Sequence, residues 1–256
     1  MAEIAHASRL SLKPYTPHPA FEQTDHRPWP LPNRNWLLKQ QWNHLLFIHY
    51  ALDAEQVRAM IPEPLEIDTY DGKAWLGVVP FDMKGVGLRG LPTLRSLSDF
   101  PEINLRTYVT YQGKPGVWFI SLDVPHRIPV YIARTAFHLP YYYSHVRIAT
   151  SGTWTQYNHR REDQIFRARY RPLKPVQFEE GSFETWATER YCLYSQSASG
   201  NLYRAEVQHK RWPLQLAEME LEENTMLSGF DTSEAHPSLL YSESLEVVAY
   251  RPQLCV

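Results

Sequence analysis

Apolar and polar residues alternate, or apolar residues run together for the length of a strand, through most of the chain after residue 41. Both patterns are typical of β-strands, half-buried in the first case and fully buried in the second. The predicted strands cover residues 42–52, 65–70, 73–83, 103–111, 117–124, 141–150, 152–159, 165–173 and 245–252. A further strand opens the segment 201–227, whose remainder fits a helix or an edge strand. The pattern therefore predicts a β-rich chain.

Turn and helix signals separate these strands. Asp71-Gly72 predicts a tight hairpin, and the five residues 112–116 predict a longer one. Asp53 is a candidate N-cap for a helix that ends before Pro62. Two more helices are expected, one over 128–139 and a short one that opens the segment 182–194 and runs into a strand. The basic, glycine-rich segment 84–97 is expected to be a loop.

Proline divides the chain into an arm and a domain. Residues 1–35 are crowded with proline, which removes backbone donors and favours extended conformations in the residue before it. We therefore expect an extended proline-rich arm over 1–35, laid across the domain surface. Residues 36–256 show neither a linker nor an exact repeat, so they are expected to form a single domain.

Charge and composition exclude several classes of partner. Lys+Arg number 26 and Asp+Glu 28, a net charge of −2, which gives no electrostatic case for nucleic-acid binding. No apolar run approaches the ~18 residues of a membrane helix, and the N-terminus lacks an apolar signal segment. We therefore expect a cytoplasmic protein with no nucleic-acid partner and no membrane partner.

The sequence contains no strong motif for binding a metal or a cofactor. The two cysteines make a disulfide framework or a cysteine zinc site improbable, and Cys192 is expected to be a buried, inert thiol. His209, with His44, is the best pair of histidine ligands, but no short metal-binding spacing supports it. No glycine-rich phosphate loop precedes a helix. We expect no metal and no cofactor.

Several motifs resemble a known family. The stretch Phe47–Gly72, a strand followed by a short helix and a PEPLEID strand, resembles the entry segment of the acetoacetate decarboxylase-like fold. Further motifs resemble the uncharacterised YqjF-like family within that fold. They are W..LLF.H at 42–49, E.NLRTYV at 102–109, GKPGVWFISLD at 113–123, R..F.LPY at 134–141, TERYCLY at 188–194 and H..WPLQ.A at 209–217. The resemblance covers about residues 27–250.

This resemblance implies a fold and raises a question about chemistry. It implies an α+β, β-rich fold in which a bent antiparallel sheet closes into a cone or barrel with short helices around an enclosed pocket. Acetoacetate decarboxylase forms a Schiff base through one of two adjacent lysines. Tyr141 and Tyr142 stand where those lysines should be, and no two of the seven lysines are adjacent. Schiff-base decarboxylation is therefore not expected.

A polar wall is predicted on one strand. Glu102, Asn104 and Arg106 alternate, so their side chains point to one face, where burying them unpaired would be costly. One interpretation is a binding wall in which Glu102 acts as acid or base and Arg106 holds a carboxylate. The other is a structural network of ion pairs between strands. The sequence leaves both open.

Other candidate ligand-binding residues lie further along the chain. Arg134 and His138 are four apart, which predicts one helical face close to Tyr141 and Tyr142. Glu189 and the neighbouring Arg190 form a second polar group, in which Arg190 is expected to pair with a buried carboxylate. His209 completes the candidate set.

Three functions remain open. The first is a protein that binds a small organic acid or carbonyl compound in an aromatic, arginine-lined pocket. The second is an enzyme of the lyase or hydratase type that uses Glu102 as acid or base. The third is a structural homo-oligomer. The sequence favours the first and does not name the ligand.

Overall fold

The computed structural model describes residues 18–177, 179–232 and 235–255, and strands dominate it. All fourteen strands belong to one sheet. Their bounds are β1 Leu38–Leu52, β2 Glu66–Ile67, β3 Ala74–Leu88, β4 Phe100–Tyr111, β5 Lys114–Val124, β6 Tyr141–Tyr143, β7 His145–Ser151, β8 Trp154–Arg161, β9 Gln164–Pro175, β10 Cys192–Gln196, β11 Leu202–His209, β12 Leu214–Asn224, β13 Ser238–Ala249 and β14 Gln253–Leu254.

The helices are short. They are the 3₁₀ turn η1 Pro19–Phe21 and the α-helices α1 Glu55–Arg58, α2 Arg95–Ser98, α3 Arg127–Ala136 and α4 Phe183–Thr188. Ser182 caps α4, because its side chain accepts from the backbone N–H of Thr185. No helix in the described residues is long and apolar enough to span a lipid bilayer.

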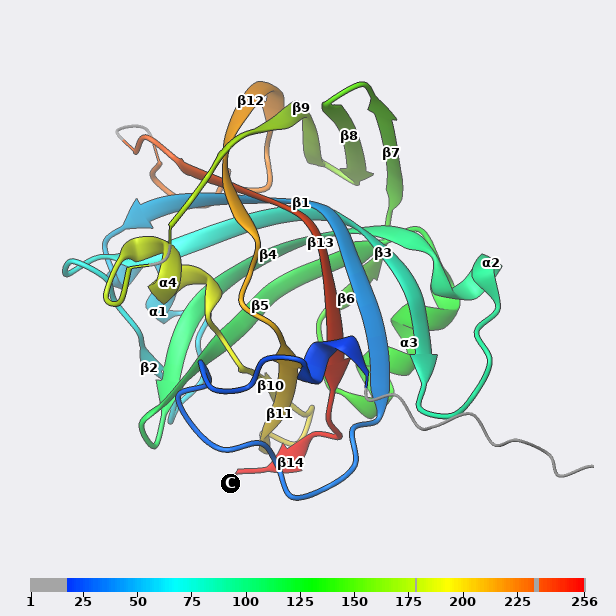
Figure 1. The fold of residues 1–256 in the computed structure, drawn as a ribbon. Helices are drawn as coiled ribbons and strands as arrows, with labels where there is room; N and C mark the ends of the chain where they lie inside the picture. The colour runs from blue at the N-terminus through cyan, green and yellow to red at the C-terminus, as the bar shows by residue number, and fades with distance from the viewer. Residues whose placement is uncertain (1–17, 178, 233–234, 256) are drawn as a thin grey trace, which may run out of the picture.

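Seven strands of the sheet close into a ring. The sheet runs β11-β10-β5-β4-β3-β1-β13, and β11 also pairs with β13, which joins the two ends (Figure 1). The closing contact consists of three residue pairs, from Val207↔Ala249 to His209↔Val247. The predicted bent sheet that closes into a barrel is therefore confirmed.

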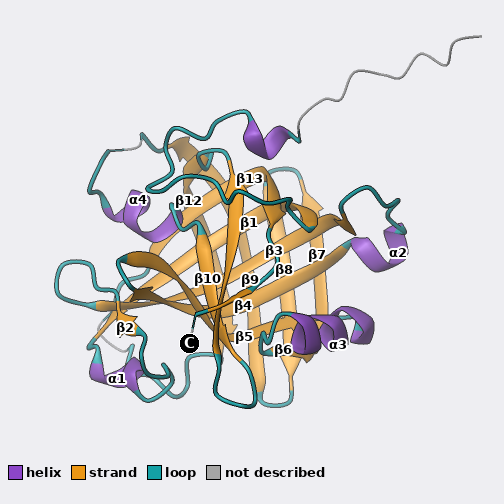
Figure 2. Cartoon of the chain, turned by 90° about the horizontal axis from the view of Figure 1, so that it is seen from below, coloured by secondary structure: helices purple, strands orange, loops and turns teal. Residues whose placement is uncertain are grey.

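The remaining large strands extend the sheet beyond the ring. From β13 the order continues through β12, β9, β8 and β7 (Figure 2). Tyr157 and Phe166 of this extension pack in one cluster with Leu46, Ile48 and Val78 of the ring strands. The extension thus covers the outer face of these ring strands. Their inner face carries the alternate residues, such as Phe47 and Val79, which pack in a second cluster.

Several local predictions were wrong. Asp53 does not cap a helix: α1 begins after Ala54, and the Asp53 carboxylate lies 2.6 Å from Lys73 Nζ. The predicted strand 141–150 is two strands, since β6 pairs with β5 and β7 pairs with β8. The segment 84–97 is only partly a loop, because β3 continues to Leu88 and α2 begins at Arg95.

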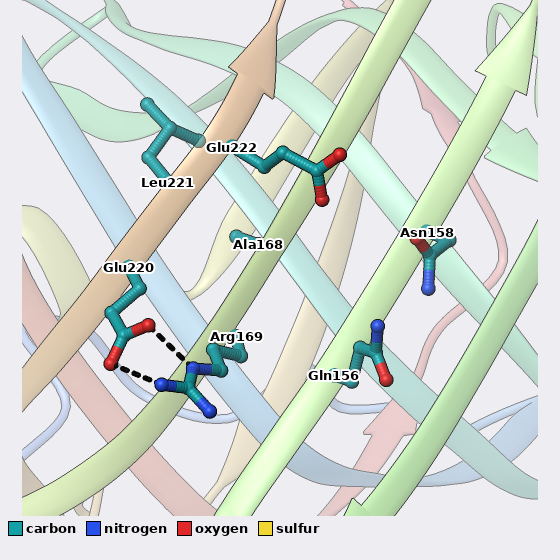
Figure 3. A pocket seen from close by; sticks show the side chains of 7 residues that line it. All are labelled: Gln156, Asn158, Ala168, Arg169, Glu220, Leu221 and Glu222. Carbon is teal, nitrogen blue, oxygen red and sulfur yellow. Dashed lines mark hydrogen bonds and ion pairs between the residues drawn. The ribbon is translucent and has the colours of Figure 1, made fainter.

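The ambiguous segment after Trp212 is the strand β12, held by charge pairs to β9. Arg169 donates two hydrogen bonds to Glu220, at 2.5 and 2.7 Å, and Arg171 lies 2.6 Å from Glu218. Figure 3 shows the Arg169–Glu220 pair beside a surface hollow of about 250 Å³. Such exposed pairs each stabilise little but favour one strand register.

Gly116 allows β5 and β10 to pack closely. A Cβ at this position would lie 2.8 Å from Cys192 Sγ and 2.9 Å from the Cys192 carbonyl oxygen. We expect Gly116→Ala to lower the free energy of unfolding by about 1–3 kcal/mol, because backbone must shift to accept the methyl group. Gly229→Ala is the control, since nothing lies within 4 Å there. Equal urea midpoints for the two variants would contradict this account.

Candidate functional site

The inner face of the ring gathers side chains from strands far apart in the sequence. Phe47 of β1 meets Trp212, with ring centroids 5.0 Å apart, and the Arg190 guanidinium lies 4.9 Å from the ring centre of Tyr108 of β4. Glu102, Asn104, Arg106 and Tyr108 occupy alternate positions along β4, and the proximity of Asn104 favours the charged form of Glu102. The predicted polar wall is thus a set of neighbouring side chains on one strand.

Glu102 is a buried carboxyl with neutral partners. Only 2% of the residue is exposed, and the Tyr141 hydroxyl donates to Glu102 Oε2 at 2.8 Å. Burial raises the pKa of Glu102 to about 8, against the opposing effects of its hydrogen bond from Tyr141 and of the nearby Asn104. The carboxyl is therefore mostly protonated at neutral pH and can donate a proton.

Tyr141 takes the place that the resemblance assigns to a lysine. It belongs to β6, which pairs in parallel with β5. Burial, followed by the proximity of Glu102, raises the pKa of its phenol well above the ordinary value. The group facing Glu102 is thus a neutral hydroxyl rather than an amine.

A second polar group lies further along the same strand. The Tyr108 hydroxyl accepts from Arg106 Nη2 at 3.1 Å and contacts His49 Nε2 of β1. The Arg106 guanidinium lies 5.1 Å from the centre of the Phe47 ring. Burial lowers the pKa of His49, and the nearby positive charges of Arg106 and Arg190 lower it further. The His49 ring is therefore neutral.

Arg190 brings a second cation to this group. As expected, it pairs with a carboxylate: its Nη1 donates to Asp68 Oδ2, while its Nε donates to the Trp186 carbonyl at 2.6 Å. Phe183 and Trp186 of α4 cover the region, with the Phe183 ring edge-on to His49 at 5.4 Å. The short helix α4 therefore closes one end of the inner face with aromatic side chains.

This arrangement leaves positive charge and polar atoms without partners. Neither Arg106 nor Glu102 forms an ion pair within the described residues, so the alternative of an ion-pair network between them is not what β4 shows. Four atoms of buried or half-buried residues have no hydrogen-bond partner there: His49 Nδ1, Asn104 Oδ1, Arg106 Nε and Arg190 Nη2. Unpaired polar atoms in such a place are costly unless a polar molecule meets them.

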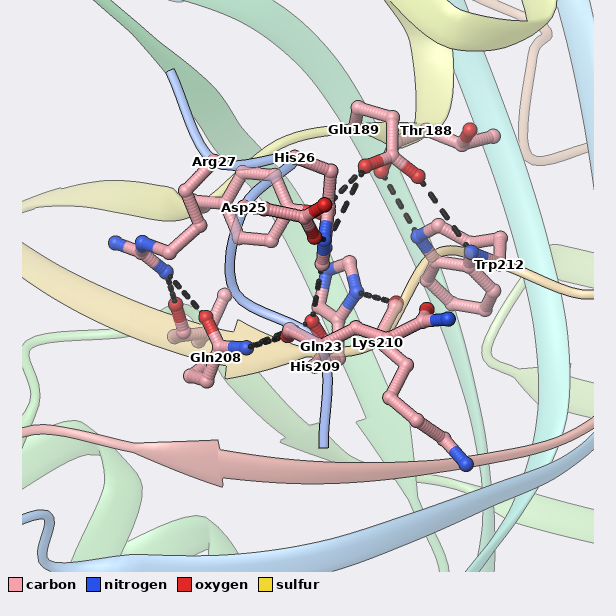
Figure 4. Close-up of polar contacts among 12 residues, drawn as sticks. Gln23, Asp25, His26, Arg27, Thr188, Glu189, Gln208, His209, Lys210 and Trp212 are labelled. Atoms are coloured by element: carbon pink, nitrogen blue, oxygen red, sulfur yellow. Dashed lines mark hydrogen bonds and ion pairs between the residues drawn. The ribbon is translucent and has the colours of Figure 1, made fainter. Parts of the chain in front are cut away.

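Glu189 and His209 belong to a different group, tied to the N-terminal arm (Figure 4). Glu189 accepts from the Tyr191 hydroxyl, and the His26 ring lies 4.0 Å from it. His209 contacts the Lys210 carbonyl through Nδ1 at 2.7 Å, and burial lowers its pKa to about 4. These contacts make both residues part of the packing between the arm and β11.

Arg134, His138 and Tyr142 lie apart from Glu102. The prediction of one helical face for Arg134 and His138 was wrong, because α3 ends at Ala136 and His138 adopts a φ of 55°. The His138 ring packs on Tyr203, while Arg134, exposed, lies 5.7 Å from the Tyr142 ring. Tyr142 points to the opposite face of β6 from Tyr141, and its ring centre lies 4.2 Å from the Arg161 guanidinium carbon.

Three inner-face residues were missed as site residues: His49, Tyr108 and Asp68. Tyr108 continues the alternation of 102, 104 and 106, so the same pattern could have included it. His49 lies two residues after the apolar Phe47 on β1, so strand geometry places the two side chains on the same face. Asp68 had no such signal, since only the fold brings it to Arg190.

Cys192 is buried in β10. Burial raises the pKa of Cys192 to about 12, so the thiol stays protonated. Among the residues that the structure describes, no group of three or more His, Cys, Asp or Glu side chains could hold a metal ion.

The model of DUF2071, a family described as an uncharacterized conserved protein, matches residues 39–246. The chain belongs to this family. It is also 41% identical over 224 residues to the uncharacterized protein YqjF of Bacillus subtilis (strain 168), a match that covers 85% of this chain and 92% of the relative. The YqjF-like resemblance is thereby confirmed.

Solved structures show where this DUF2071 chain stands among folds. It is similar to acetoacetate decarboxylase from Legionella pneumophila subsp. pneumophila str. Philadelphia 1, with a TM-score of 0.63, 12% identity, and coverage of 96% of this chain and 98% of that one. An acetoacetate decarboxylase-like enzyme from Sphingomonas wittichii RW1 gives 0.61 and 13%, covering 87% and 95%. The enduracididine biosynthesis enzyme MppR, complexed with pyruvate, gives 0.61 and 11%, covering 88% and 91%. The fold is thus acetoacetate decarboxylase-like.

Proposed function

We propose that the inner face of the ring binds a small organic acid that also carries a carbonyl or hydroxyl group. The carboxylate of such a ligand pairs with Arg106 and Arg190, whose two positive charges face the single negative charge of Asp68. Its carbonyl or hydroxyl group then lies near Asn104, the neighbouring residue on the same face of β4, whose Oδ1 has no partner among the described residues. The observation that carries this proposal is the set of unpaired polar atoms on His49, Asn104, Arg106 and Arg190.

The comparisons support this ligand class only through the fold. MppR, which shares the fold at 11% identity, binds pyruvate, a 2-oxo acid that combines a carboxylate with an adjacent carbonyl. The guanidinium groups of the inner face suit the carboxylate of such a molecule, and the neighbouring unpaired polar atoms suit its carbonyl. We therefore take 2-oxo acids as the first ligands to test.

The proposal does not include Schiff-base decarboxylation. That reaction needs an amine that condenses with the ketone of the substrate. The hydroxyl of Tyr141, at the place of the lysine, donates to Glu102 and cannot form an imine. Incubation with acetoacetate and borohydride tests this point: no mass increase is expected, and a covalent adduct on an inner-face lysine would contradict it.

Titration calorimetry with pyruvate tests the binding proposal. We expect Arg106→Gln to weaken binding by about 10–100-fold, because a charge-assisted hydrogen bond to a carboxylate is worth about 1.5–3 kcal/mol. Arg134→Gln is the matched control, since this arginine is exposed on α3 outside the inner face. If pyruvate and larger 2-oxo acids bind neither protein, or bind both equally, the proposal fails.

A second candidate, catalysis by Glu102, is favoured by one observation. A carboxyl with a pKa of about 8 can donate a proton near neutral pH and accept it back, as lyase and hydratase steps require. Glu102→Gln keeps the shape and the hydrogen bond from Tyr141 but removes the titrating proton. If the variant binds the ligand as before and the parent alone converts it, the chain is an enzyme; if neither converts it, binding is the function.

A further inference from the structure

The net charge of the chain is near zero, but its basic and acidic residues are unevenly distributed along the sequence. Residues 84–98 contain three basic residues and residues 124–161 contain five, and neither segment contains an aspartate or a glutamate. These basic residues are Lys84, Arg89, Arg95, Arg127, Arg134, Arg147, Arg160 and Arg161. The rest of the chain must therefore carry a marked excess of negative charge, since the total is −2.

The fold places these two segments side by side. Phe100, directly after α2, packs edge-on against His126 at the start of α3, with ring centroids 5.6 Å apart. The Arg127 guanidinium lies 4.4 Å from the ring centre of Tyr143, which connects α3 to β6 and β7. Figures 1 and 2 both show α2 and α3 as neighbours at one side of the barrel. Residues 84–98 and 124–147 thus form one surface, which we call the basic face.

Large apolar side chains protrude from the basic face. Eight of the eleven large hydrophobic residues exposed in the described chain lie here, with exposed fractions of 38–71%. They are Leu88, Leu91, Leu94, Leu97, Ile128, Tyr131, Ile132 and Tyr143. The four leucines recur every third residue around the turn that leads into α2, three others lie on α3, and Tyr143 ends β6. An apolar patch of this size marks an interaction surface.

We propose that the basic face docks on the surface of an anionic lipid bilayer, a membrane partner contrary to the expectation from the sequence, which rested only on spanning and signal segments. Leucine, isoleucine and tyrosine side chains at the tip of a turn and on a surface helix can insert between lipid headgroups. The exposed arginines around them then meet the headgroup phosphates, while their stems cover apolar surface. A hollow of about 640 Å³ adjoins this face, and Tyr143, His145, Arg160 and the acidic Glu162 are among the residues that line it.

The charge pattern favours a bilayer over the other occupants. A second copy that used the same face would bring like charges together, which opposes a symmetric dimer. Nucleic acid would use the arginines but gains nothing from exposed leucines and isoleucines. The acidic groups at the border have partners of their own: Asp82 lies 3.2 Å from Lys84, Asp123 pairs with Arg161, and Asp99 accepts from the Gly85 N–H at 3.0 Å.

Vesicle sedimentation of the full chain tests the proposal. We expect binding to vesicles of phosphatidylcholine mixed with phosphatidylglycerol and little binding to phosphatidylcholine vesicles. Binding should fall steeply between about 0.1 M and 0.5 M salt, because screening shortens the range of the attraction. The double variant Leu94→Asp/Ile132→Asp should reduce the bound fraction at least several-fold, whereas Leu254→Asp, equally exposed outside the face, should not.

The same proteins yield the results that would overturn the proposal. Absence of binding to anionic vesicles, or equal binding by the double variant and the control, rejects a bilayer. A dimer in native mass spectrometry that Leu94→Asp/Ile132→Asp dissociates would assign the face to a second copy. Far-ultraviolet circular dichroism first establishes that both variants fold like the parent, and Arg95→Glu/Arg127→Glu provides an independent loss of binding that leaves every apolar side chain in place.

Discussion

Replacement of Arg27 by methionine is expected to destabilise the protein by about 3–5 kcal/mol, because it removes the nearer cation of the buried Glu206 carboxylate and leaves only Arg204, 3.9 Å away. The Arg27 and Glu206 side chains are only 1% and 6% exposed, and Arg27 Nη2 lies 3.1 Å from Glu206 Oε2. The same guanidinium donates to the Val207 carbonyl at 2.6 Å and to Gln208 Oε1 at 2.9 Å. Urea unfolding followed by tryptophan fluorescence measures the loss.

Two further variants make this prediction specific. Lys73→Met breaks the ion pair between Lys73 and Asp53, two side chains that are both more than half exposed. It should lower the free energy of unfolding by less than about 1 kcal/mol. The double variant Arg27→Met/Glu206→Gln should recover part of the loss, since it removes the uncompensated charge. If Arg27→Met costs no more than Lys73→Met, the arm does not contribute to stability through this ion pair.

Glu102→Gln is expected to change how stability depends on pH. The folded chain holds the Glu102 proton up to a pKa of about 8, against an ordinary value of 4.5 in the unfolded chain. Between these values the folded state binds more protons, so its free energy of unfolding falls as pH rises, by about 5 kcal/mol in all. The variant cannot ionise at this position and should lack that fall.

The comparison is made as the difference between parent and variant at several pH values. Near pH 5 the two should be similar in stability, and near pH 8.5 the variant should be the more stable one. Glu220→Gln is the control, because hydrogen bonds from Arg169 lower the pKa of this exposed carboxyl, the opposite direction. Parallel pH profiles for the parent and Glu102→Gln would show that the carboxyl is ionised in the folded state.

Periodicity in the sequence was sufficient for the strands and for the polar wall on β4. The alternation of Glu102, Asn104 and Arg106 is a local property, and strand geometry converts it directly into a shared face. The ring itself came from resemblance, since β11 and β13 pair through residues some forty positions apart in the sequence. Pairing of this kind leaves no trace in local pattern.

Local signals failed where tertiary contacts decide. A four-residue spacing placed Arg134 and His138 on one helical face, but α3 stops at Ala136, four residues before Pro140. Glu189 was grouped with the binding residues as part of a polar group in an apolar segment, and His209 as the best histidine ligand. In the structure Glu189 accepts from the Tyr191 hydroxyl with His26 of the arm 4.0 Å away, and His209 Nδ1 contacts the Lys210 carbonyl.

The closure of the ring has a consequence for hydrogen exchange and for aggregation. β13 meets β11 through three residue pairs but meets β1 through eleven, so the β11–β13 contact is the weaker of the two strand contacts that β13 makes within the ring. Arg27 reinforces it by bonding Val207 and Gln208 from outside. Amide hydrogens at 207–209 and 247–249 should therefore exchange before those of β1 through local opening. A chain that lacks residues 18–35 would open there more often and expose two unpaired strand edges, which are templates for intermolecular sheets.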